Sequence, residues 1–369
     1  MNNYRIFILG VGSLGQLVAH ALRKEHPGLR ITFLLHRSEI ASQWYASGEA
    51  IRCVTNGRID HSGDFDIELI SSPATRQVVY TPPKSPIKFL LVATKTYATS
   101  EALSSLKHRL GSSSTICFMQ NGVMDEVTSS VFSDAKSRPS YWAAVCGRSV
   151  NRTSLFSIAH SGSGGIEFGA VSLAPKNLLN PDLTPSPPPD LMIRLLLATP
   201  ALQPVLMTPD HIKIAQLRKV VVNASINPLT AIFRCKLGQL LDNPLRFRLM
   251  RALFEEAQAI AREIISEALP YSASAWQEEN VWLSVKTVAE NGRANQSSML
   301  QDVMAGRQTE IDYINGYLIS QARRLGVCCN KHKIVTGMVK SLRVFEDDEV
   351  LSTFAVRKDF AKGNSVDNS

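Results

Sequence analysis

The segment that most constrains the fold is a short apolar strand followed at once by a glycine-rich turn and a helix. Ile6 to Leu9 are continuously apolar, as in a strand that is buried on both faces. Residues 16–24 then place apolar side chains at helical spacing. The turn between them has the spacing GxGxxG and consists of Gly10, Val11, Gly12, Ser13, Leu14 and Gly15. This order predicts a βα unit whose helix begins next to a bound ligand.

Each glycine of the turn has a distinct physical task in such a unit. Gly10 permits the tight turn, Gly12 lets the backbone approach a pyrophosphate, and Gly15 lets the helix pack closely on the strand. Free N–H groups and the helix dipole at the start of the helix favour phosphate groups. A plain glycine turn is the alternative, but the strand before it and the helix after it favour a dinucleotide site.

The end of the second strand bears on the choice between NAD and NADP. Ile31 to Leu35 form an apolar strand, and Arg37 follows two residues later. An acidic residue there would accept a hydrogen bond from the ribose 2′-OH, whereas an arginine favours the 2′-phosphate of NADP. Arg37 therefore predicts NADPH as the cofactor, although Glu39 is close enough to argue for the opposite choice.

Two further polar residues follow apolar strands. Lys95 comes directly after residues 89–93, and Asn121 follows residues 115–119. Ligands of open α/β sheets bind outside the carboxyl ends of the strands, so both side chains are candidates for cofactor or substrate contacts. A surface lysine and an ordinary Asn-Gly turn are the alternatives.

The first half alternates apolar strands with helical patterns, which predicts a Rossmann-type parallel α/β domain over residues 1–206. Two segments, near 56–85 and 175–205, are rich in turn residues or prolines and are interpreted as insertions. The second of them is expected to hold neither a helix nor a central strand. The expected strands are residues 5–9, 31–35, 89–93, 115–119 and 141–146.

The second half is predicted to be an all-α domain over residues 207–345, followed by a C-terminal tail, 346–369, with a disordered end. Apolar side chains recur at helical spacing through most of this half. The expected helices are residues 211–233, 244–269, 274–289, 298–305 and 309–325.

One of these helices carries an unusual polar stripe. Lys219, Asn223 and Asn227 are spaced i, i+4, i+8, which keeps them on one helical face. The residues between them are almost all apolar, so the helix should be buried. Polar groups on a buried helix need partners or a cleft, and the stripe therefore predicts a cleft rather than a solvent-facing surface. Pro228 is expected to kink the helix.

A second polar set follows near residues 298–316. Ser298 and Asp302 are spaced i, i+4 on one expected helix. Thr309 and Asp312 have the spacing of a capping box at the start of the next helix. That arrangement would place Glu310 in the first helical turn, where an acidic side chain also stabilises the helix dipole.

Composition excludes several other classes. The net charge is +8, but basic runs are short and lack interleaved aromatics, so an anionic small molecule is preferred over nucleic acid. No apolar run approaches the roughly 18 residues that cross a bilayer, and the N-terminus has no secretory pattern. The six cysteines have no metal-site spacing, and the adjacent Cys328 and Cys329 leave a redox switch open. We expect a cytoplasmic protein with reduced thiols.

Together these motifs resemble the ketopantoate reductase family. The resemblance rests on four blocks that run in family order along most of the chain. The last two are the most specific. The blocks are the glycine turn at 10–15, Lys95 with Gln120-Asn121-Gly122, the 219–231 helix, and residues 298–302 with 309–316.

The resemblance implies NADPH-dependent reduction of 2-dehydropantoate to pantoate. In that family Lys219 would be the general acid and Glu310 its acidic partner. Ser298 would contact the substrate carboxylate, and Asn121, Asn223 and Asn227 would be amides of the substrate cleft. Lys95 would contact the cofactor or line the cleft, and Asn121 could also reach the cofactor. Arg37 matches the 2′-phosphate position.

Two alternatives stay open at this level. The chain is longer than compact bacterial members, so another branched 2-oxo acid could be the substrate. A cofactor-binding sensor or assembly protein without turnover is the second alternative, but the joint presence of Lys219, Asn223, Ser298 and Glu310 disfavours it. A homodimer is the assembly that the resemblance allows.

Overall fold

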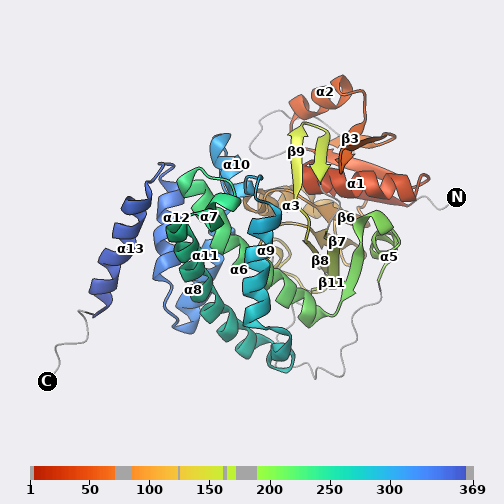
Figure 1. Cartoon of the computed structure of the whole chain (residues 1–369). Coiled ribbons are helices and arrows are strands. Elements are labelled where there is room, and N and C mark those ends of the chain that lie inside the picture. The colour runs from red at the N-terminus through yellow and green to blue at the C-terminus, as the bar shows by residue number, and fades with distance from the viewer. Residues whose placement is uncertain (1–3, 71–84, 124, 161–163, 172–188, 363–369) are drawn as a thin grey trace. The chain divides into compact units, whose positions relative to one another are not determined.

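The computed structural model describes residues 4–70, 85–123, 125–160, 164–171 and 189–362 (Figure 1). Its contacts divide the chain into two compact units. The sheet unit comprises residues 1–120 and 124–215, and the helical unit comprises residues 121–123 and 216–369. This division differs from the predicted boundary at residue 206, and it assigns Asn121 to the helical unit.

The sheet unit is built on an eight-stranded sheet in which every neighbouring pair is parallel except β8 with β11. The Rossmann-like α/β class is confirmed. The strand order is β12 (Pro204–Met207), β11 (Ile166–Ala170), β8 (Ser140–Cys146), β7 (Thr115–Phe118), β6 (Phe89–Val92), β1 (Arg5–Leu9), β2 (Arg30–Leu35) and β5 (Asp66–Leu69).

Both faces of this sheet are covered, which explains why its central strands are continuously apolar. One face packs in a core around Phe33 and Trp44, to which α1 (Ser13–Glu25), α2 (Ser38–Ala46) and α5 (Leu191–Leu197) contribute. The other face packs in a core around Leu90, with α3 (Thr99–Leu106) and α4 (Asp125–Val131).

A second, four-stranded sheet was not predicted from the sequence. Its order is β4 (Arg58–Ser62), β3 (Ile51–Thr55), β10 (Ser157–His160) and β9 (Val150–Ser154), and α1 packs against it (Figure 1). The predicted insertion near 56–85 therefore contains β4 and β5. Strand β4 is largely exposed and mostly polar, so it lacks the apolar alternation that identifies a strand. Residues 71–84 of that prediction lie outside the described residues.

The expectation that residues 175–205 contain no helix is wrong for their last part. Helix α5 begins after Asp190, whose side chain accepts a hydrogen bond from the Ile193 N–H at 3.1 Å. This is a standard N-terminal cap. The prolines end at residue 189 and resume at Pro200, so they frame the helix rather than interrupt it. Residues 172–188 lie outside the described part of the chain.

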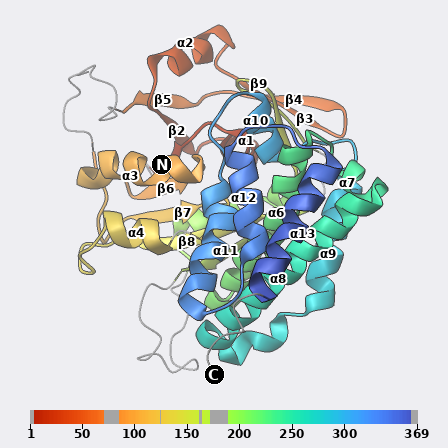
Figure 2. The same ribbon diagram turned by 90° about the vertical axis from the view of Figure 1, so that its left-hand side faces the viewer.

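The helical unit contains α6 (Pro209–Phe233), whose first turns belong to the sheet unit, where Ile212 packs with Ala143. The α-helices that follow α6 are α7 (Gly238–Asp242), α8 (Pro244–Ala268), α9 (Glu278–Asn291), α10 (Ser298–Met304), α11 (Ile311–Leu325), α12 (Asn330–Lys340) and α13 (Asp347–Lys362). Helices α8, α11 and α12 pack on one another, and α13 packs on α12 (Figure 2).

The segment predicted as a C-terminal tail, residues 346–369, is helical over most of its length, because it contains α13. Asp347 at its start accepts hydrogen bonds from the Arg246 guanidinium and the Asn243 amide, both at 2.7 Å. Asn243 in turn caps α8. The helix is thus attached to the unit by polar contacts that its own sequence does not reveal. The expected disorder at residues 363–369 lies outside the described residues.

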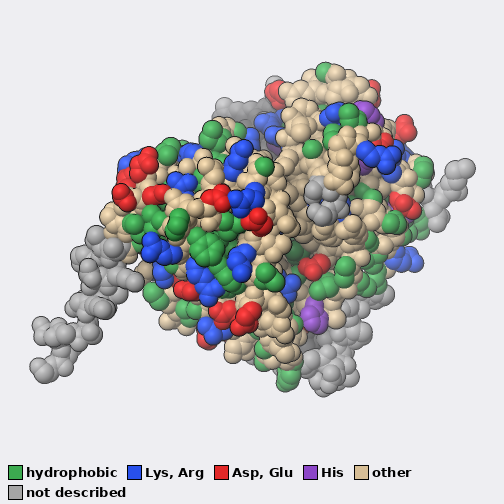
Figure 3. All heavy atoms as spheres, viewed as in Figure 1, with side chains coloured by type: hydrophobic (Ala, Val, Ile, Leu, Met, Phe, Trp, Pro, Cys, Tyr) green, Lys and Arg blue, Asp and Glu red, His purple; other side chains and the backbone are tan. Residues whose placement is uncertain are grey.

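On the face shown in Figure 3, lysine and arginine side chains are interspersed with aspartate and glutamate over the described residues. Such a distribution gives no single basic surface on that face, although the chain carries a net charge of +8. Within the described residues, no helix combines the length and the apolar character that a membrane span requires.

Candidate active site

The glycine turn has the conformation that its sequence predicts. Gly10 follows β1 with φ at +104°, a conformation that residues with a side chain rarely adopt. A Cβ on Gly10 would lie 2.7 Å from the backbone of Ala93, and a Cβ on Gly15 would contact the Gly10 carbonyl oxygen. The tight turn and the close packing assigned to these two glycines are therefore both present.

Gly12 is different, because its surroundings leave room. A Cβ there would lie no closer than 3.6 Å to another atom, and Gly12 is the N-terminal cap residue of α1. No described side chain caps the first turn of α1. Backbone N–H groups at an uncapped helix start, beside a residue without a side chain, are suited to bind a phosphate group.

The turn is supported by Gln16, a residue whose role the sequence does not reveal. Its side-chain amide is fully buried and donates a hydrogen bond to the Val11 carbonyl at 2.8 Å. This buried hydrogen bond stabilises the conformation of the turn. Because this bond uses a carbonyl of the turn, it occupies none of the turn's N–H groups.

Arg37 lies where the sequence predicts, just beyond the carboxyl end of β2 and before α2. Its side chain is exposed, and β2 is the direct parallel neighbour of β1. The carboxyl ends of parallel neighbours lie at the same sheet edge, so Arg37 and the glycine turn share that edge. Glu39 lies in the first turn of α2.

Lys95 follows β6, the other neighbour of β1, and its side chain is half-buried. The turn that carries it is fixed by Thr94, Thr99 and Gln120. The Gln120 amide donates to the Thr94 hydroxyl at 3.0 Å and also to Thr99, whose hydroxyl donates to the Lys95 carbonyl at 3.3 Å. This polar cluster joins the ends of β6 and β7, and none of its threonines was singled out from the sequence.

Within the helical unit, three of the predicted residues form a hydrogen-bonded chain. The Asn223 amide of α6 donates to the Asn121 carbonyl oxygen at 3.2 Å. The Asn121 amide in turn donates to the Glu310 carboxylate at 3.1 Å. Asn121, Asn223 and Glu310 are far apart in the sequence, and both hydrogen bonds join their side chains. Gly122, with φ at +88°, permits the turn that carries Asn121.

The stripe on α6 is present as predicted along one continuous helix. Lys219 and Asn223 are half-buried, whereas Asn227 is only 6% exposed. Lys219 lies one helical turn before Asn223, so these two side chains project from the same face of α6. Pro228 lies inside the helix, which continues to Phe233.

The predicted capping box at Thr309 and Asp312 is wrong. Helix α11 begins at Ile311, and Glu310 occupies the N-terminal cap position without making a side-chain cap. Glu310 is only 6% exposed, and its carboxylate binds Asn121 instead. The carboxylate thus belongs to a polar cluster with Asn121 and does not cap the helix.

Ser298 is the exposed first residue of α10, so its hydroxyl is accessible. The preceding residue, Ser297, caps α10 and shares a 2.6 Å hydrogen bond with the Thr230 hydroxyl of α6. This bond ties the start of α10 to the stripe-bearing helix. Asp302, the other member of the predicted pair, is buried and binds Arg307 at 3.0 Å.

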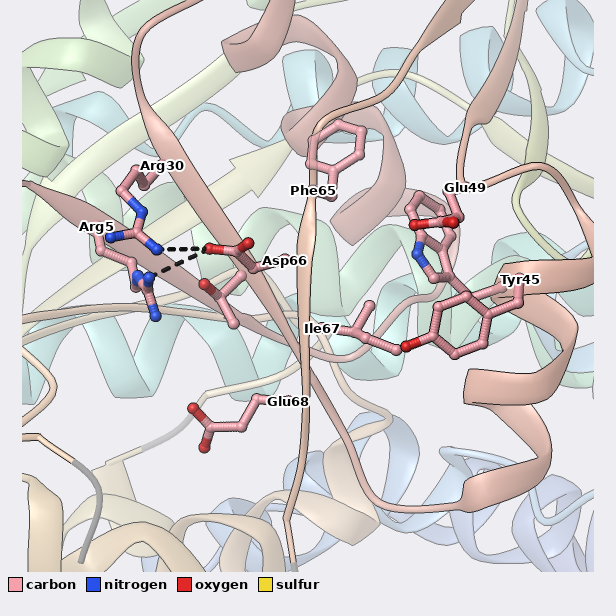
Figure 4. Close-up of a pocket in the computed structure, with 10 residues that line it drawn as sticks. Arg5, Arg30, Tyr45, Glu49, Phe65, Asp66, Ile67 and Glu68 are labelled. Atoms are coloured by element: carbon pink, nitrogen blue, oxygen red, sulfur yellow. Dashed lines mark hydrogen bonds and ion pairs between the residues drawn. The ribbon is translucent and has the colours of Figure 1, made fainter. Parts of the chain in front are cut away.

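A separate recess of about 430 Å³ lies in the sheet unit and is shown in Figure 4. There Asp66 binds both Arg5 and Arg30 at 3.2 Å. These three residues are the first of β5, β1 and β2, so the recess lies at the amino ends of the strands. Because dinucleotides bind at the carboxyl ends, this recess is not the cofactor site.

The cysteines form no disulfide in the described structure, and five of the six are buried. Burial raises the pKa of Cys329 to about 12, which keeps the thiol protonated and unreactive at neutral pH. A redox switch at Cys328 and Cys329 is therefore disfavoured.

Comparisons with known proteins agree with this arrangement. Residues 6–172 match the family model described as ketopantoate reductase PanE/ApbA, and residues 211–343 match its C-terminal model. A probable 2-dehydropantoate 2-reductase of Schizosaccharomyces pombe is 28% identical over 92% of this chain and 97% of its own length. A ketoisovalerate reductase of Beauveria bassiana is 26% identical over 94% of this chain and 85% of its own length.

A solved structure agrees as well. The crystal structure of a probable 2-dehydropantoate 2-reductase from Bacillus subtilis is 28% identical, with a TM-score of 0.64. It covers 92% of this chain and all of its own. The chain therefore belongs to the ketopantoate reductase family, a family of oxidoreductases that use a nicotinamide cofactor and act on a CH–OH group.

Proposed function

We propose that this chain uses NADPH to reduce the C2 carbonyl of a 2-oxo acid, with 2-dehydropantoate as the first candidate substrate. The observation that carries the proposal is the chain from Asn223 through Asn121 to Glu310, one helical turn from Lys219. The chain links two amides and a carboxylate, and the Lys219 ammonium adds the proton donor that reduction of a carbonyl group can use.

The residues of the sheet unit fit a dinucleotide. The open space at Gly12 and the uncapped start of α1 suit a pyrophosphate, and the exposed Arg37 suits a 2′-phosphate. Lys95 adds a positive charge at the neighbouring strand end. When bound, NADPH supplies the hydride that reaches the carbonyl carbon.

Residues of the protein stabilise the charge that develops on the substrate and donate the proton. The carbonyl oxygen becomes negative during reduction, and the Lys219 ammonium stabilises it and donates the proton that completes the hydroxyl group. The negative charge of the Glu310 carboxylate favours the protonated form of Lys219. The same carboxylate accepts a hydrogen bond from the product hydroxyl. Asn121, Asn223 and Asn227 orient the substrate, and Ser298 contacts its carboxylate.

A second candidate substrate is 2-ketoisovalerate. The relative from Beauveria bassiana, similar over nearly the whole chain, is named a ketoisovalerate reductase. The two acids share the 2-oxo carboxylate and differ in the branched end. NADPH oxidation with each acid, followed by absorbance, tests the proposal and ranks the substrates by kcat/KM. Absence of NADPH oxidation with any branched 2-oxo acid, together with NADPH binding, would favour a sensor or assembly role.

The choice of cofactor gives a first prediction. Replacing Arg37 with glutamate should raise the KM for NADPH by about 10- to 100-fold, because a charge-assisted bond to the 2′-phosphate is worth about 1.5–3 kcal/mol. The KM for NADH should change little or fall. Steady-state kinetics with both cofactors measure this, and Arg58→Glu, at an exposed arginine of β4, is the control. An equal effect on both cofactors would assign the 2′-phosphate to another residue.

A homodimer also stays a prediction for this chain. A ketopantoate reductase structure from Staphylococcus aureus with the same fold is described as dimeric. Sedimentation of the full chain at several concentrations tests whether this chain assembles in the same way.

A further inference from the structure

Pro228 lies inside α6. In a helix, each N–H donates to the carbonyl four residues earlier, and proline has no N–H. Pro228 therefore removes the bond that the Ala224 carbonyl would otherwise receive. Ala224 is buried, and it directly follows Asn223, a member of the amide chain. A buried carbonyl without a partner is costly, so another donor is expected.

That donor is the side chain of Asn315 on α11. Its amide nitrogen donates to the Ala224 carbonyl at 3.2 Å, and Asn315 is fully buried. Asn315 lies five residues after Glu310, just over one turn into the helix that Glu310 precedes. A single amide thus connects the helix bearing Lys219 and Asn223 to the helix that positions Glu310.

The orientation of this amide is set by His332 on α12. The same Asn315 nitrogen lies 2.9 Å from the His332 Nδ1, and the His332 Nε2 lies 3.1 Å from the Leu253 carbonyl. Because the amide nitrogen donates, Nδ1 must accept, and because the carbonyl accepts, Nε2 must carry the proton. A flipped Asn315 amide would face both acceptors with its oxygen. Both contacts therefore disfavour the flip. In the orientation present, the Asn315 oxygen has no hydrogen-bond partner among the described residues.

We propose that Asn315, oriented by neutral His332, is a positioning residue for the reaction. It supplies the hydrogen bond that Pro228 removes from α6, and so holds Asn223 and Lys219 in register with Glu310. This inference rests on the proposed function, in which those residues act together. Without the Asn315 amide, α6 and α11 can shift and lengthen the hydrogen bonds that pass through Asn121.

The second-site test uses Pro228 itself. Asn315→Ala should lower kcat by about 10- to 100-fold. The Ala224 carbonyl would lose its donor, and the resulting shift of Lys219, the proton donor, would slow the reaction by a factor of this size. Pro228→Ala should stay within about threefold of wild type. The double variant should recover to within about fivefold, because the backbone N–H that Pro228→Ala restores can donate to the Ala224 carbonyl. If the fold-loss of kcat in the double variant equals the product of the fold-losses in the two single variants, the inference is overturned.

Folding and function are separated by parallel measurements. Thermal midpoints of all four proteins report the hydrogen bond itself, whereas kcat reports positioning. If wild type reduces no 2-oxo acid, the proposed function fails, whatever the midpoints show. If wild type is active and Asn315→Ala lowers only the midpoint, the positioning inference alone fails. If Asn315→Ala does not fold, an active double variant supports the inference and an inactive or unfolded one contradicts it.

His332 gives an independent prediction through pH. Burial lowers the pKa of His332 to about 4, from an ordinary value of 6.5. Between these values the unfolded chain binds a proton that the native protein does not, so native stability falls as pH falls from about 6.5 toward 4. The charged groups around it are Lys331 on α12 and Glu256 on α8, whose carboxylate accepts from the Lys331 and His332 N–H groups.

His332→Asn should keep an acceptor near the Nδ1 position but cannot titrate. We expect kcat within about threefold of wild type and a smaller drop in thermal midpoint between pH 6.5 and 4.5. His332→Leu removes the acceptor and should lower kcat to the level of Asn315→Ala. Equal kcat values for the two His332 variants would show that the acceptor at this position does not orient Asn315.

Discussion

Replacing Lys219 with alanine is expected to lower kcat by about 10²- to 10⁴-fold, which is the usual contribution of a positioned proton donor. This corresponds to about 3–5 kcal/mol of transition-state stabilisation. The substitution removes the ammonium group of the α6 stripe, one turn from Asn223. The amide chain and Glu310 stay in place, so the substrate should still bind with a similar KM.

Binding of NADPH should persist in this variant, because the glycine turn and Arg37 belong to the sheet unit. The dissociation constant measured by fluorescence is expected within about threefold of wild type. Lys236→Ala is the matched control, since Lys236 is an exposed lysine just beyond the end of α6. A Lys219→Ala enzyme with near-normal kcat would remove this residue from the proton-donor role. Loss of NADPH binding would instead indicate a structural defect.

The parts of the site that could be predicted from the sequence are those set by local periodicity. Strand β1 has the predicted bounds, and α6 begins only two residues before the prediction. Gly10 and Gly15 have tasks that follow from backbone geometry alone, so their spacing was sufficient. The stripe on α6 could be placed on one face because 3.6 residues per turn fix the relation between Lys219 and Asn223.

The contacts that complete the site depend on tertiary packing, and no local pattern encodes them. Asn121 reaches Glu310 across 189 residues of sequence, and a turn residue of the strand half thereby joins the helical unit. Thr309 and Asp312 have the spacing of a capping box, but α11 begins one residue too late for it. The Glu310 carboxylate binds the half-buried Asn121 amide instead of capping the helix end.

Pro228 shows how a local signal can be read only in part. In the sequence, Pro228 predicts a kink, because proline disrupts the helical hydrogen-bond ladder. It also identifies Ala224 as a carbonyl that needs a donor from elsewhere. That step was available from the sequence, whereas the identity of the donor, Asn315, was not. His332 gave no signal at all, since a single histidine near an apolar run is usually a surface or core residue.

The glycine turn gives the second large effect. Gly10→Ala is expected to destabilise the protein by about 3 kcal/mol or more. A non-glycine residue at φ of +104° costs about 1–3 kcal/mol. Its Cβ would also lie 2.7 Å from the Ala93 backbone, which cannot move without disturbing β6. Thermal unfolding should show a clearly lower midpoint, and NADPH binding should be lost with the native turn.

Gly12→Ala is the informative partner, because it separates folding from ligand binding. Its Cβ has 3.6 Å of clearance and its φ is −72°, so stability should fall by less than about 1 kcal/mol. The added methyl group nevertheless stands at the uncapped start of α1, where the pyrophosphate would approach. We therefore expect a near-normal thermal midpoint together with a weakening of NADPH binding by at least about 10-fold.

Gly28→Ala serves as the neutral comparison, since a Cβ there meets nothing within 4 Å. Normal midpoint and normal NADPH affinity are expected for it. The two turn glycines should therefore differ in thermal midpoint, which falls only for Gly10→Ala. A general loss of backbone freedom in the turn would instead lower the midpoint of both variants alike. If Gly12→Ala binds NADPH as tightly as Gly28→Ala does, the pyrophosphate cannot lie against the start of α1. The dinucleotide site would then have to be sought elsewhere on the carboxyl edge of the sheet.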